Sequence, residues 1–380
     1  MTTNSSWQTY LFRVIAGDEK GLSASTIRGF LDGLEFIYRG LSRFKYTTAR
    51  RHRLPVPVIS IGNITVGGTG KTPTVVWLVR KLKAAGFTPA VLTRGYGGSS
   101  QAGGMIFTSS DLAGLTAQRT GDEPFLLAKM LGDTTIVVGR ERYLNGLQAL
   151  RINPDIDLFI LDDGFQHWGL ERDLDVVIID ASRPFSNRHL LPRGFLREPL
   201  SSLKRAGVIL LTRTAKLSED ALNQLTVEIS AFASQAVVAT ITEESPRLIP
   251  LIDFSTGREN GVIPAAQFLS GRKVAAVTGI GNPRQFLASL ENMGAEVGYF
   301  QAYPDHYHWE EHEIIDLVKG LAENGFSELI ITAKDGVKFE TGLDKLVGYP
   351  LTCYILSLGF TVTDELVTRR IEAVTNPINS

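Results

Sequence analysis

Cysteine is almost missing from this sequence, in which Cys353 is the single one among 380 residues. One cysteine can form neither an intrachain disulfide nor a cysteine-rich metal site, so both are excluded. The first residues, MTTNSSWQTYLF, lack the charged-then-apolar order of a secretory signal. No stretch approaches the roughly 18 uninterrupted apolar residues of a membrane span. We therefore expect a cytoplasmic protein without a membrane-spanning helix.

Acidic residues are missing from one long window, although the formal net charge of the whole chain is only -1. Between Glu35 and Asp111 there is no Asp or Glu. The same window holds the basic residues Arg39, Arg43, Lys45, Arg50, Arg51, Arg53, Lys71, Arg80, Lys81, Lys83 and Arg94. This one-sided distribution of charge favours an anionic ligand or an anionic surface as partner.

A glycine-rich segment lies inside this window, between two periodic patterns. Apolar residues from Val56 to Ile61 predict a short buried strand, and those from Val75 to Leu82 recur at helical spacing. The segment between them runs through Thr65, Val66, Gly67, Gly68, Thr69, Gly70, Lys71 and Thr72. Between a strand and a helix, backbone N–H groups of such a loop can surround phosphate oxygens at the positive end of the helix. The pattern predicts a nucleotide-binding phosphate loop.

In this interpretation Lys71 contacts the β- and γ-phosphates and Thr72 places its hydroxyl on Mg²⁺. The strict pattern has a glycine five residues before Gly70, where this chain has Thr65. A glycine-rich turn that binds nothing is the alternative, and the flanking strand and helix argue against it.

Beyond the loop, short segments rich in Val, Ile and Leu alternate with helical patterns around Phe125–Leu131 and Arg142–Leu150. The expected strands are Pro89–Thr93, Thr134–Val138, Asp157–Leu161, Asp175–Ile179, Val208–Thr212, Lys273–Thr278, Ala295–Phe300, Glu328–Thr332 and Cys353–Leu356. The alternation predicts an α/β fold, a P-loop NTPase-like parallel sheet with a second, smaller α/β C-terminal domain. We expect the core at 1–225, the smaller domain at 226–380, and functional loops at the carboxyl ends of strands.

Two carboxylates, Asp162 and Asp163, follow one predicted strand and precede Gly164. At the carboxyl end of a strand, in a chain with a phosphate loop, they are placed to ligate Mg²⁺ or its water shell. A plain Asp-Asp-Gly turn is the alternative. Gln166 and His167 follow closely, where they could contact phosphates or a second substrate.

Asp122 opens a predicted helix, so it could be an N-cap or could accept the proton of a substrate hydroxyl. The segment Tyr303–His308 and His312 have a spacing that could suggest zinc, but no nearby ligand set completes a tetrahedron. One histidine acting on an aspartate or a phosphate is the favoured interpretation.

Two further segments carry charge. Arg193, Arg197 and Glu198 lie on Leu191–Pro199, which either brings arginines to a nucleotide or is a solvated loop. Upstream, one helical stripe, at about residues 25–45, contains Ile27, Phe30, Leu31, Leu34, Ile37, Tyr38, Leu41 and Phe44. With its basic tail, this helix could lie in a membrane interface or could pack on the core. Residues 1–20 show little pattern.

Seven motifs, ITVGGTGKTP, GDEP, LDDGFQH, LPRGFLREP, TGIGNP, YPDHY and TAKD, occur here in one order. From about Ile27 to Lys338 the chain resembles the tetraacyldisaccharide 4'-kinases, the lipid A 4'-kinase or LpxK family. The resemblance implies transfer of the γ-phosphate of ATP, with Mg²⁺, to the 4'-hydroxyl of a tetraacyldisaccharide 1-phosphate, giving lipid IV-A. It also implies a peripheral protein on the cytoplasmic face of the inner membrane of a Gram-negative bacterium, with no nucleic-acid partner.

Carried over motif by motif, the resemblance implies that Asp122 is the catalytic base and is paired with His306. Asp162 and Asp163 would serve the metal. The other positions expected to line the site are Glu123, Arg142, Gln166, His167, Arg197 and Glu198. Because His306 falls in the expected C-terminal domain, we expect domain closure to assemble the pair. A lipid substrate also favours the membrane role of the amphipathic helix.

Three residues depart from the family pattern: Ala333 where an acidic residue is common, Trp168 where a basic one is common, and Arg193 where a small one is usual. Two other classes are disfavoured. A dimerising ATPase switch needs a signature lysine where this chain has Val66, and a GTP-binding module needs an Asn-Lys-x-Asp stretch that Leu211–Thr214 lacks. A kinase for another sugar-type acceptor stays an alternative.

Overall fold

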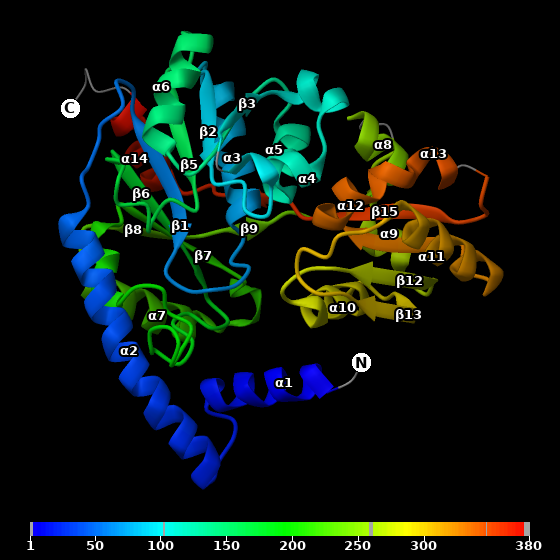
Figure 1. Cartoon of the computed structure of the whole chain (residues 1–380), viewed down its shortest axis with the longest axis horizontal. Coiled ribbons are helices and arrows are strands. Elements are labelled where there is room, and N and C mark those ends of the chain that lie inside the picture. The colour runs from blue at the N-terminus through cyan, green and yellow to red at the C-terminus, as the bar shows by residue number, and fades with distance from the viewer. Residues whose placement is uncertain (1–2, 102, 258–260, 347, 376–380) are drawn as a thin grey trace. The chain divides into compact units, whose positions relative to one another are not determined.

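The computed structural model describes residues 3–101, 103–257, 261–346 and 348–375 (Figure 1). These residues form two compact units that share the chain in alternation. The first unit contains Met1–Lys71, Asp163–Thr242 and Val362–Ser380, and the second contains Thr72–Asp162 and Glu243–Thr361. The expected domains, 1–225 and 226–380, remain a prediction. No helix among the described residues has the length and the apolar character needed to cross a membrane.

The first unit contains parallel strands in the order β1-β6-β7-β8. Their bounds are β1 Val58–Asn63, β6 Leu174–Asp180, β7 Val208–Thr212 and β8 Val237–Thr240. Every residue of β1 and β7 is buried, as expected for parallel strands whose two faces are both covered. The predicted strands Asp175–Ile179 and Val208–Thr212 are therefore confirmed, whereas β8 was not predicted.

The helices of this unit are α1 Thr3–Ala16, α2 Leu22–Thr48, α7 Glu219–Phe232 and α14 Glu365–Thr375. Helix α1 corrects the expectation that residues 1–20 lack a pattern. Its carboxyl end is held by tertiary contacts, since the carbonyl of Ile15 accepts hydrogen bonds from Asn187 at 2.7 Å and from Arg193 at 3.3 Å. Helix α2, the long blue helix of Figure 1, spans the predicted amphipathic segment.

In the second unit, four strands run in the order β3-β4-β2-β5. Their bounds are β3 Met105–Phe107, β4 Thr135–Val138, β2 Pro89–Thr93 and β5 Leu158–Asp162. Strand β2 is parallel to β4 and β5, and β3 is an antiparallel edge. The helices that accompany them are α3 Lys71–Ala84, α4 Ala117–Thr120, α5 Asp122–Leu131 and α6 Arg142–Ile152.

The same unit has a six-stranded sheet in the order β11-β10-β15-β14-β12-β13. The bounds are β11 Ile263–Pro264, β10 Arg247–Pro250, β15 Thr352–Ser357, β14 Glu328–Thr332, β12 Lys273–Thr278 and β13 Glu296–Ala302. Pairs among β13, β12, β14 and β15 are parallel, and β10 is antiparallel. Its helices are α8 Leu251–Thr256, α9 Ala265–Leu269, α10 Pro283–Asn292, α11 Glu311–Glu323, α12 Ala333–Phe339 and α13 Leu343–Leu346. The α/β class with parallel sheets is as predicted.

Helices α5 and α12 are joined by a small apolar cluster. Phe125 and Leu126 of α5 pack with Val337 of α12, and Ala333 is half-buried against them. The cluster brings the first turn of α5 to one face of α12. It also gives Ala333, where an acidic residue was expected, a packing role.

Candidate active site

The phosphate loop leaves β1 and ends at Lys71, the first residue of α3. Gly67 has φ 112° and Gly70 has φ 95°, a backbone region that residues with a Cβ avoid. A Cβ built on Gly67 or Gly68 would meet no atom within 4 Å, so no other part of the chain crowds these two exposed positions of the loop. A curl of exposed backbone N–H groups before a helix is the geometry that receives an anion.

The segment Leu191–Pro199 lies along this loop. The N–H of Val66 donates to the carbonyl of Phe195 at 2.8 Å, and the N–H of Arg197 donates to the carbonyl of Ile64 at 2.7 Å. These backbone pairs fix the segment beside the loop, so the alternative of a solvated loop is wrong.

The side chains of Arg193 and Arg197 point to different partners. Arg197 donates to both carboxylate oxygens of Asp163, at 3.0 and 3.1 Å. Arg193 instead forms an ion pair with Asp32 of α2 at 3.0 Å. Arg193, where a small residue is usual in the family, thus attaches the segment to α2.

Lys71 and Arg197 meet at one carboxylate. The Nζ of Lys71 lies 3.4 Å from Asp163 Oδ1 and 3.3 Å from the amide oxygen of Asn63. Burial raises the pKa of Asp163, but the charges of Lys71 and Arg197 outweigh it and leave that pKa lowered. Asp163, at φ 49°, is therefore an ionised carboxylate held between two cations.

Asp162 has a different environment. It is buried at the end of β5 with 5% exposure and accepts a hydrogen bond from Thr93 at 3.0 Å. Thr72 stands in the first turn of α3. A threonine hydroxyl and a carboxylate are hard oxygen donors of the kind that Mg²⁺ prefers, whereas Asp163 is already neutralised by two cations. The donor set fits Mg²⁺ through Thr72 and Asp162.

A buried polar layer supports the loop from the side of Gln166. Its amide donates to the carbonyl of Asn63 and to Glu198, both at 2.9 Å. Glu198 is 3% exposed and is bound by Arg205 at 2.9 and 3.0 Å. Burial raises the pKa of Glu198, although Arg205 and Gln166 oppose the rise. These residues hold the backbone of the loop rather than face its open side.

Asp122 lies in the first turn of α5, but it is not the N-cap. The cap position is Gly121, which has no side chain to accept a hydrogen bond, so the capping alternative is wrong. Asp122 Oδ2 lies 3.0 Å from Nδ1 of His306, which is 184 residues away in the sequence and in the same unit. The pair is already formed, so the expected closure is not needed to assemble it.

Neighbouring charges set the protonation of this pair. Burial raises the pKa of Asp122. The hydrogen bonds from His306 and Lys338 lower it by more than burial raises it, so the pKa lies below its ordinary value. The hydrogen bond to Asp122 raises the pKa of His306 above its ordinary value, against burial. An ionised carboxylate and a readily protonated imidazole thus share one hydrogen bond.

A pocket of about 340 Å³ opens onto the pair, and it is lined by Tyr96, Gly97, Ala117, Gln118, Asp122, His306, Tyr307, His308 and Lys338. The ring centroid of Tyr96 lies 5.6 Å from that of His306, and the two rings are tilted by 53°. Next to Asp122, Glu123 forms an ion pair with Lys334. Lys338 was missed by sequence analysis. Its spacing of four from Lys334 on one helix is the signal that places both on one face.

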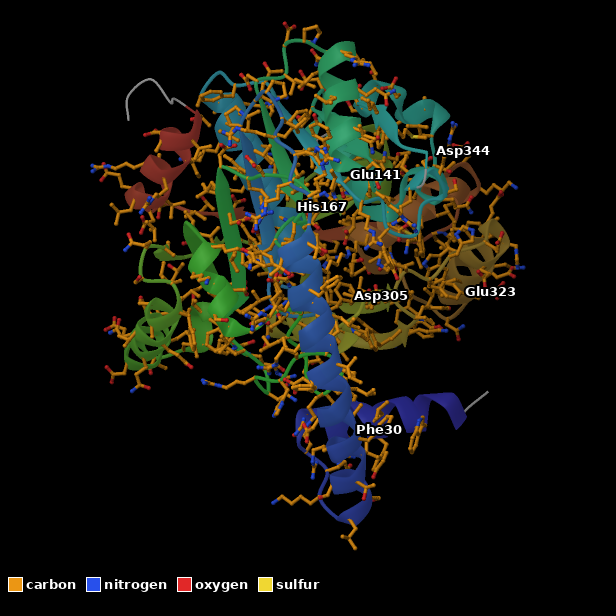
Figure 2. All side chains as sticks on the ribbon, turned by 60° about the vertical axis from the view of Figure 1, so that its left-hand side comes forward. Phe30, Glu141, His167, Asp305, Glu323 and Asp344 are labelled. Carbon is orange, nitrogen blue, oxygen red and sulfur yellow. The ribbon has the colours of Figure 1, made fainter. Side chains whose placement is uncertain are left out.

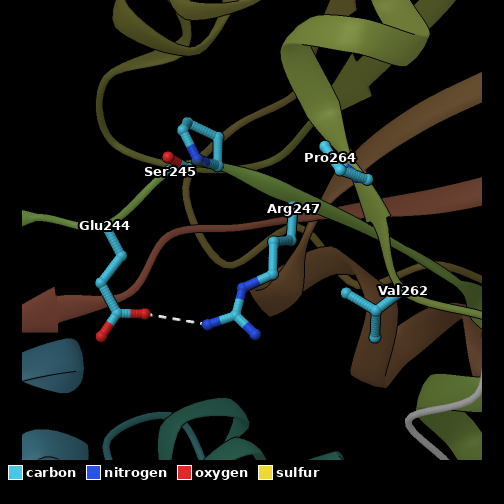
Figure 3. Close-up of a pocket in the computed structure, with 6 residues that line it drawn as sticks. Glu244, Ser245, Arg247, Val262 and Pro264 are labelled. Atoms are coloured by element: carbon cyan, nitrogen blue, oxygen red, sulfur yellow. Dashed lines mark hydrogen bonds and ion pairs between the residues drawn. The ribbon is translucent and has the colours of Figure 1, made fainter.

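A second hollow of about 300 Å³ lies at the β10–β11 end of the six-stranded sheet (Figure 3). It is lined by Glu244, Ser245, Pro246, Arg247, Val262 and Pro264. Glu244 and Arg247 pair with each other at 2.9 Å. None of the predicted site residues lines it.

Three further candidates come from other segments of the chain. Arg142 begins α6 and is buried. His167, labelled in Figure 2, is half-buried in the turn after β5. His308 contacts Gln118, and its Nε2 is 3.6 Å from Glu310. Among the described residues, only Asp32, Glu35 and His189 group with the spacing of metal ligands, and Arg193 and Arg39 already pair with the two carboxylates.

Three polar residues of α2, Asp32, Glu35 and Tyr38, hold the segment that carries Arg197. Beside the Asp32–Arg193 ion pair, Glu35 Oε2 lies 2.8 Å from Nδ1 of His189. The hydroxyl of Tyr38 donates to the carbonyl of Arg197 at 3.0 Å. A polar stripe of α2 therefore reaches the backbone of a residue that contacts Asp163.

Known proteins share both the sequence and the fold. A family profile, tetraacyldisaccharide-1-P 4'-kinase (LpxK), matches residues 27–375. A tetraacyldisaccharide 4'-kinase of Halothermothrix orenii is 35% identical over 361 residues, 92% of this chain and 93% of that protein. One of Anaeromyxobacter dehalogenans is 38% identical over 296 residues, 78% and 76% of the two chains. The crystal structure of Aquifex aeolicus LpxK, an "apo" form in complex with ATP, is similar with a TM-score of 0.70 and 29% identity, covering 92% of this chain and 99% of that one. With a profile matched over nearly its whole length, the chain belongs to the tetraacyldisaccharide-1-phosphate 4'-kinase family.

Proposed function

We propose that this protein transfers the γ-phosphate of ATP to the 4'-hydroxyl of a tetraacyldisaccharide 1-phosphate, giving lipid IV-A. The observation that carries the proposal is the open phosphate loop ending at Lys71, in a chain that belongs to this family. Phosphoryl transfer needs positioning and charge neutralisation more than covalent chemistry by the protein, and the site is rich in both.

The loop from Thr65 to Thr72 binds the phosphates of ATP through its N–H groups other than that of Val66, which donates to Phe195. When these phosphates arrive, Lys71 exchanges Asp163 for phosphate oxygens, and Arg197 keeps Asp163 neutralised. Thr72 and Asp162 are the residues that would hold Mg²⁺, which neutralises charge on the phosphates when bound. Gln166 and Glu198 keep the loop in this shape, and Arg142 and His167 are assigned to the site by family resemblance alone.

Asp122 receives the sugar hydroxyl. Because both His306 and Lys338 meet Oδ2, the other oxygen, Oδ1, is the one that we assign to the hydroxyl proton. The lowered pKa of Asp122 keeps it ionised at neutral pH and makes it a weak base, which suits a loose transition state in which the proton leaves late. His306 orients the carboxylate.

The exposed side of α2 is the surface that we assign to lipid. Phe30, Ile37, Leu41 and Phe44 form one stripe on it, with exposed fractions of 68, 56, 64 and 66% (Figure 2 labels Phe30). The predicted stripe thus has two parts, since Leu31 is buried and Tyr38 packs on the core. A helix with this exposed stripe and nearby arginines fits the anionic cytoplasmic surface of the inner membrane.

The kinase proposal is tested with γ-labelled ATP and a tetraacyldisaccharide 1-phosphate in detergent micelles. Label should appear in the lipid with wild-type protein and not with K71A. If ATP is hydrolysed but no label reaches the lipid, a different acceptor or a nucleotide switch replaces the proposal.

The lipid surface is tested by sedimentation with vesicles of phosphatidylglycerol and of phosphatidylcholine. Burying one large apolar side chain contributes about 1.5–3 kcal/mol, so I37N should weaken binding to the anionic vesicles about tenfold. V227N is the control, because Val227 is an apolar residue of α7 with 71% exposure in the same unit. Equal binding of I37N and V227N would remove α2 from the membrane proposal.

A further inference from the structure

Lys338 is a buried lysine that meets Asp122 in the function proposed above but has no role of its own there. Its side chain is only 6% exposed, and lysine is rarely buried to this degree unless it is paired. Its ammonium group lies 2.9 Å from Asp122 Oδ2 and donates to the carbonyl of Tyr307 at 3.1 Å. One side chain therefore contacts the carboxylate and the residue that follows His306.

The backbone at His306 needs such support. His306 has φ 59°, a left-handed conformation that is unfavourable for a residue with a side chain. Its N–H donates to the carbonyl of Gly279 at 3.2 Å. The turn is thus held on one side by the segment after β12 and on the other by Lys338.

Both supports depend on helix α12, which holds the segment after β12 through Asp335 and contains Lys338. Asp335, which is fully buried, accepts hydrogen bonds from the N–H of Gly279 at 3.0 Å and from the hydroxyls of Thr278 and Thr332 at 3.1 and 2.6 Å. One turn later the same helix places Lys338 at Asp122. Helix α12 therefore fixes the spacing between carboxylate and imidazole.

We propose that Lys338 is a positioning residue of the Asp122–His306 pair. Its ammonium group fixes Oδ2 of Asp122 and, through the carbonyl of Tyr307, the turn that carries the imidazole, so that Oδ1 faces the substrate hydroxyl. The inference rests on the proposed function of Asp122. It adds an unassigned cation to the pair, three residues after the TAKD motif, whose Asp335 holds the Gly279 side of the same turn.

The pair has other charged neighbours, which the test must hold constant. His306 is faced by Asp122 from α5, by Lys334 from α12, by Asp305 from its own turn, and by the ring of Tyr96. Lys334 is engaged with Glu123 and is unchanged in every variant below. A change in the titration of His306 on replacing Lys338 then reports the loss of that one cation.

The test compares K338M with K129M. Lys129 is a matched control, since its side chain is 9% exposed and likewise binds one carboxylate, Glu340 at 2.9 Å, and one carbonyl, Ser255 at 3.0 Å. It lines no described pocket. Both variants lose one buried ammonium group with the same kinds of contacts, so any general cost to folding is shared.

The first readout is the imidazole titration of His306 by NMR on histidine-labelled protein, with the signal assigned from H306N. Loss of a nearby cation favours protonation, so the pKa of His306 should move upward in K338M and stay unchanged in K129M and K338R. K338Q, whose side chain is neutral but can donate hydrogen bonds, should also move the pKa of His306 upward. It is used in place of K338M if K338M does not fold.

The second readout is phosphate transfer. Misplacement of a reacting group costs about a hundredfold, so kcat should fall about that much in K338M with the KM for ATP unchanged. An unmoved titration together with a kcat equal to that of K129M would overturn the inference. A raised KM for the lipid at unchanged kcat would also overturn it, since Lys338 would then bind substrate. If the wild type transfers no phosphate, the proposed function fails, and the titration still decides the role of Lys338.

Discussion

Two carboxylates, Asp163 in the first unit and Asp122 in the second, have similar surroundings. Each is met by two groups that carry or can carry positive charge: Lys71 and Arg197 at Asp163, and His306 and Lys338 at Asp122. The pKa of both carboxyls is lowered, in each case against the effect of burial. The difference lies in the partners.

At Asp163 the partners are an ammonium and a guanidinium group, and Lys71 lies at the end of an open anion-binding loop. The lysine can exchange a carboxylate for a phosphate without any proton moving. At Asp122 one partner is an imidazole that titrates near neutral pH. The first centre is therefore built to bind anions, and the second to hold and orient a proton.

The largest expected effect is at Asp122. D122N keeps the shape of the side chain but removes its charge, and loss of an acid–base group costs about 10²–10⁴-fold in kcat. The KM for ATP should change little, because binding belongs to the other centre. Steady-state transfer assays check this, with circular dichroism as the control for folding. A kcat near that of the wild type would remove Asp122 from the chemistry.

Replacing Lys71 should come next. K71A removes one preorganised charge from the phosphates, for which about 10²–10³-fold in kcat is typical. Unlike D122N, it should also weaken ATP binding, which fluorescence titration with a labelled nucleotide measures directly. If K71A bound ATP as tightly as the wild type, the division between an anion-binding and a proton-handling centre would be lost.

The sequence was sufficient for the elements with local periodicity. Strands such as Pro89–Thr93 and Lys273–Thr278 form at the predicted bounds, because a run of apolar residues bounded by turn residues is a local signal. The phosphate loop is of the same kind. Helix α1 could not be predicted in this way, since the contacts that hold the carbonyl of Ile15 at its carboxyl end come from Asn187 and Arg193, far along the chain.

The candidate site divides along the same line. The glycines and Lys71 lie in one loop, so their spacing in the sequence predicts a phosphate site. The contact between Asp122 and His306 joins residues 184 positions apart, and only the packing of α5 and α12 sets its geometry. Arg193 and Arg197 are four residues apart with similar side chains. Nothing local indicates that one turns to α2 and the other to Asp163.

A smaller effect is expected at Arg197. R197K keeps the charge but replaces the guanidinium, whose Nη1 donates to both oxygens of Asp163, with an ammonium group on a shorter side chain that reaches Asp163 less closely. The KM for ATP should rise about tenfold, as loss of one charge-assisted hydrogen bond of about 1.5 kcal/mol implies. R193K, at the ion pair with Asp32, is the control and should leave the KM for ATP unchanged. An equal rise in both variants would mean that the segment acts only through its backbone.

The smallest effect should be on the free energy of unfolding. The dependence of this effect on pH should differ between the Asp122 centre and the Asp163 centre. Because folding raises the pKa of His306, the pair with Asp122 stabilises the protein fully below the ordinary value of about 6.5 and stops doing so as pH rises through the folded-state pKa. H306N tolerates the left-handed backbone of this position and should lower the unfolding free energy by at most about 1 kcal/mol at about pH 5.5, and by less at about pH 8.5.

Urea denaturation of wild type and H306N at both pH values measures this difference. The control is H312N, at an exposed histidine of α11, which should change the unfolding free energy little at either pH. R197K should show the same deficit at both pH values, since no imidazole takes part in the Lys71–Asp163–Arg197 contact. A deficit of H306N that stayed constant with pH would mean that His306 pairs with Asp122 as a neutral donor, and the contrast between the two carboxylates would then rest on the lysines alone.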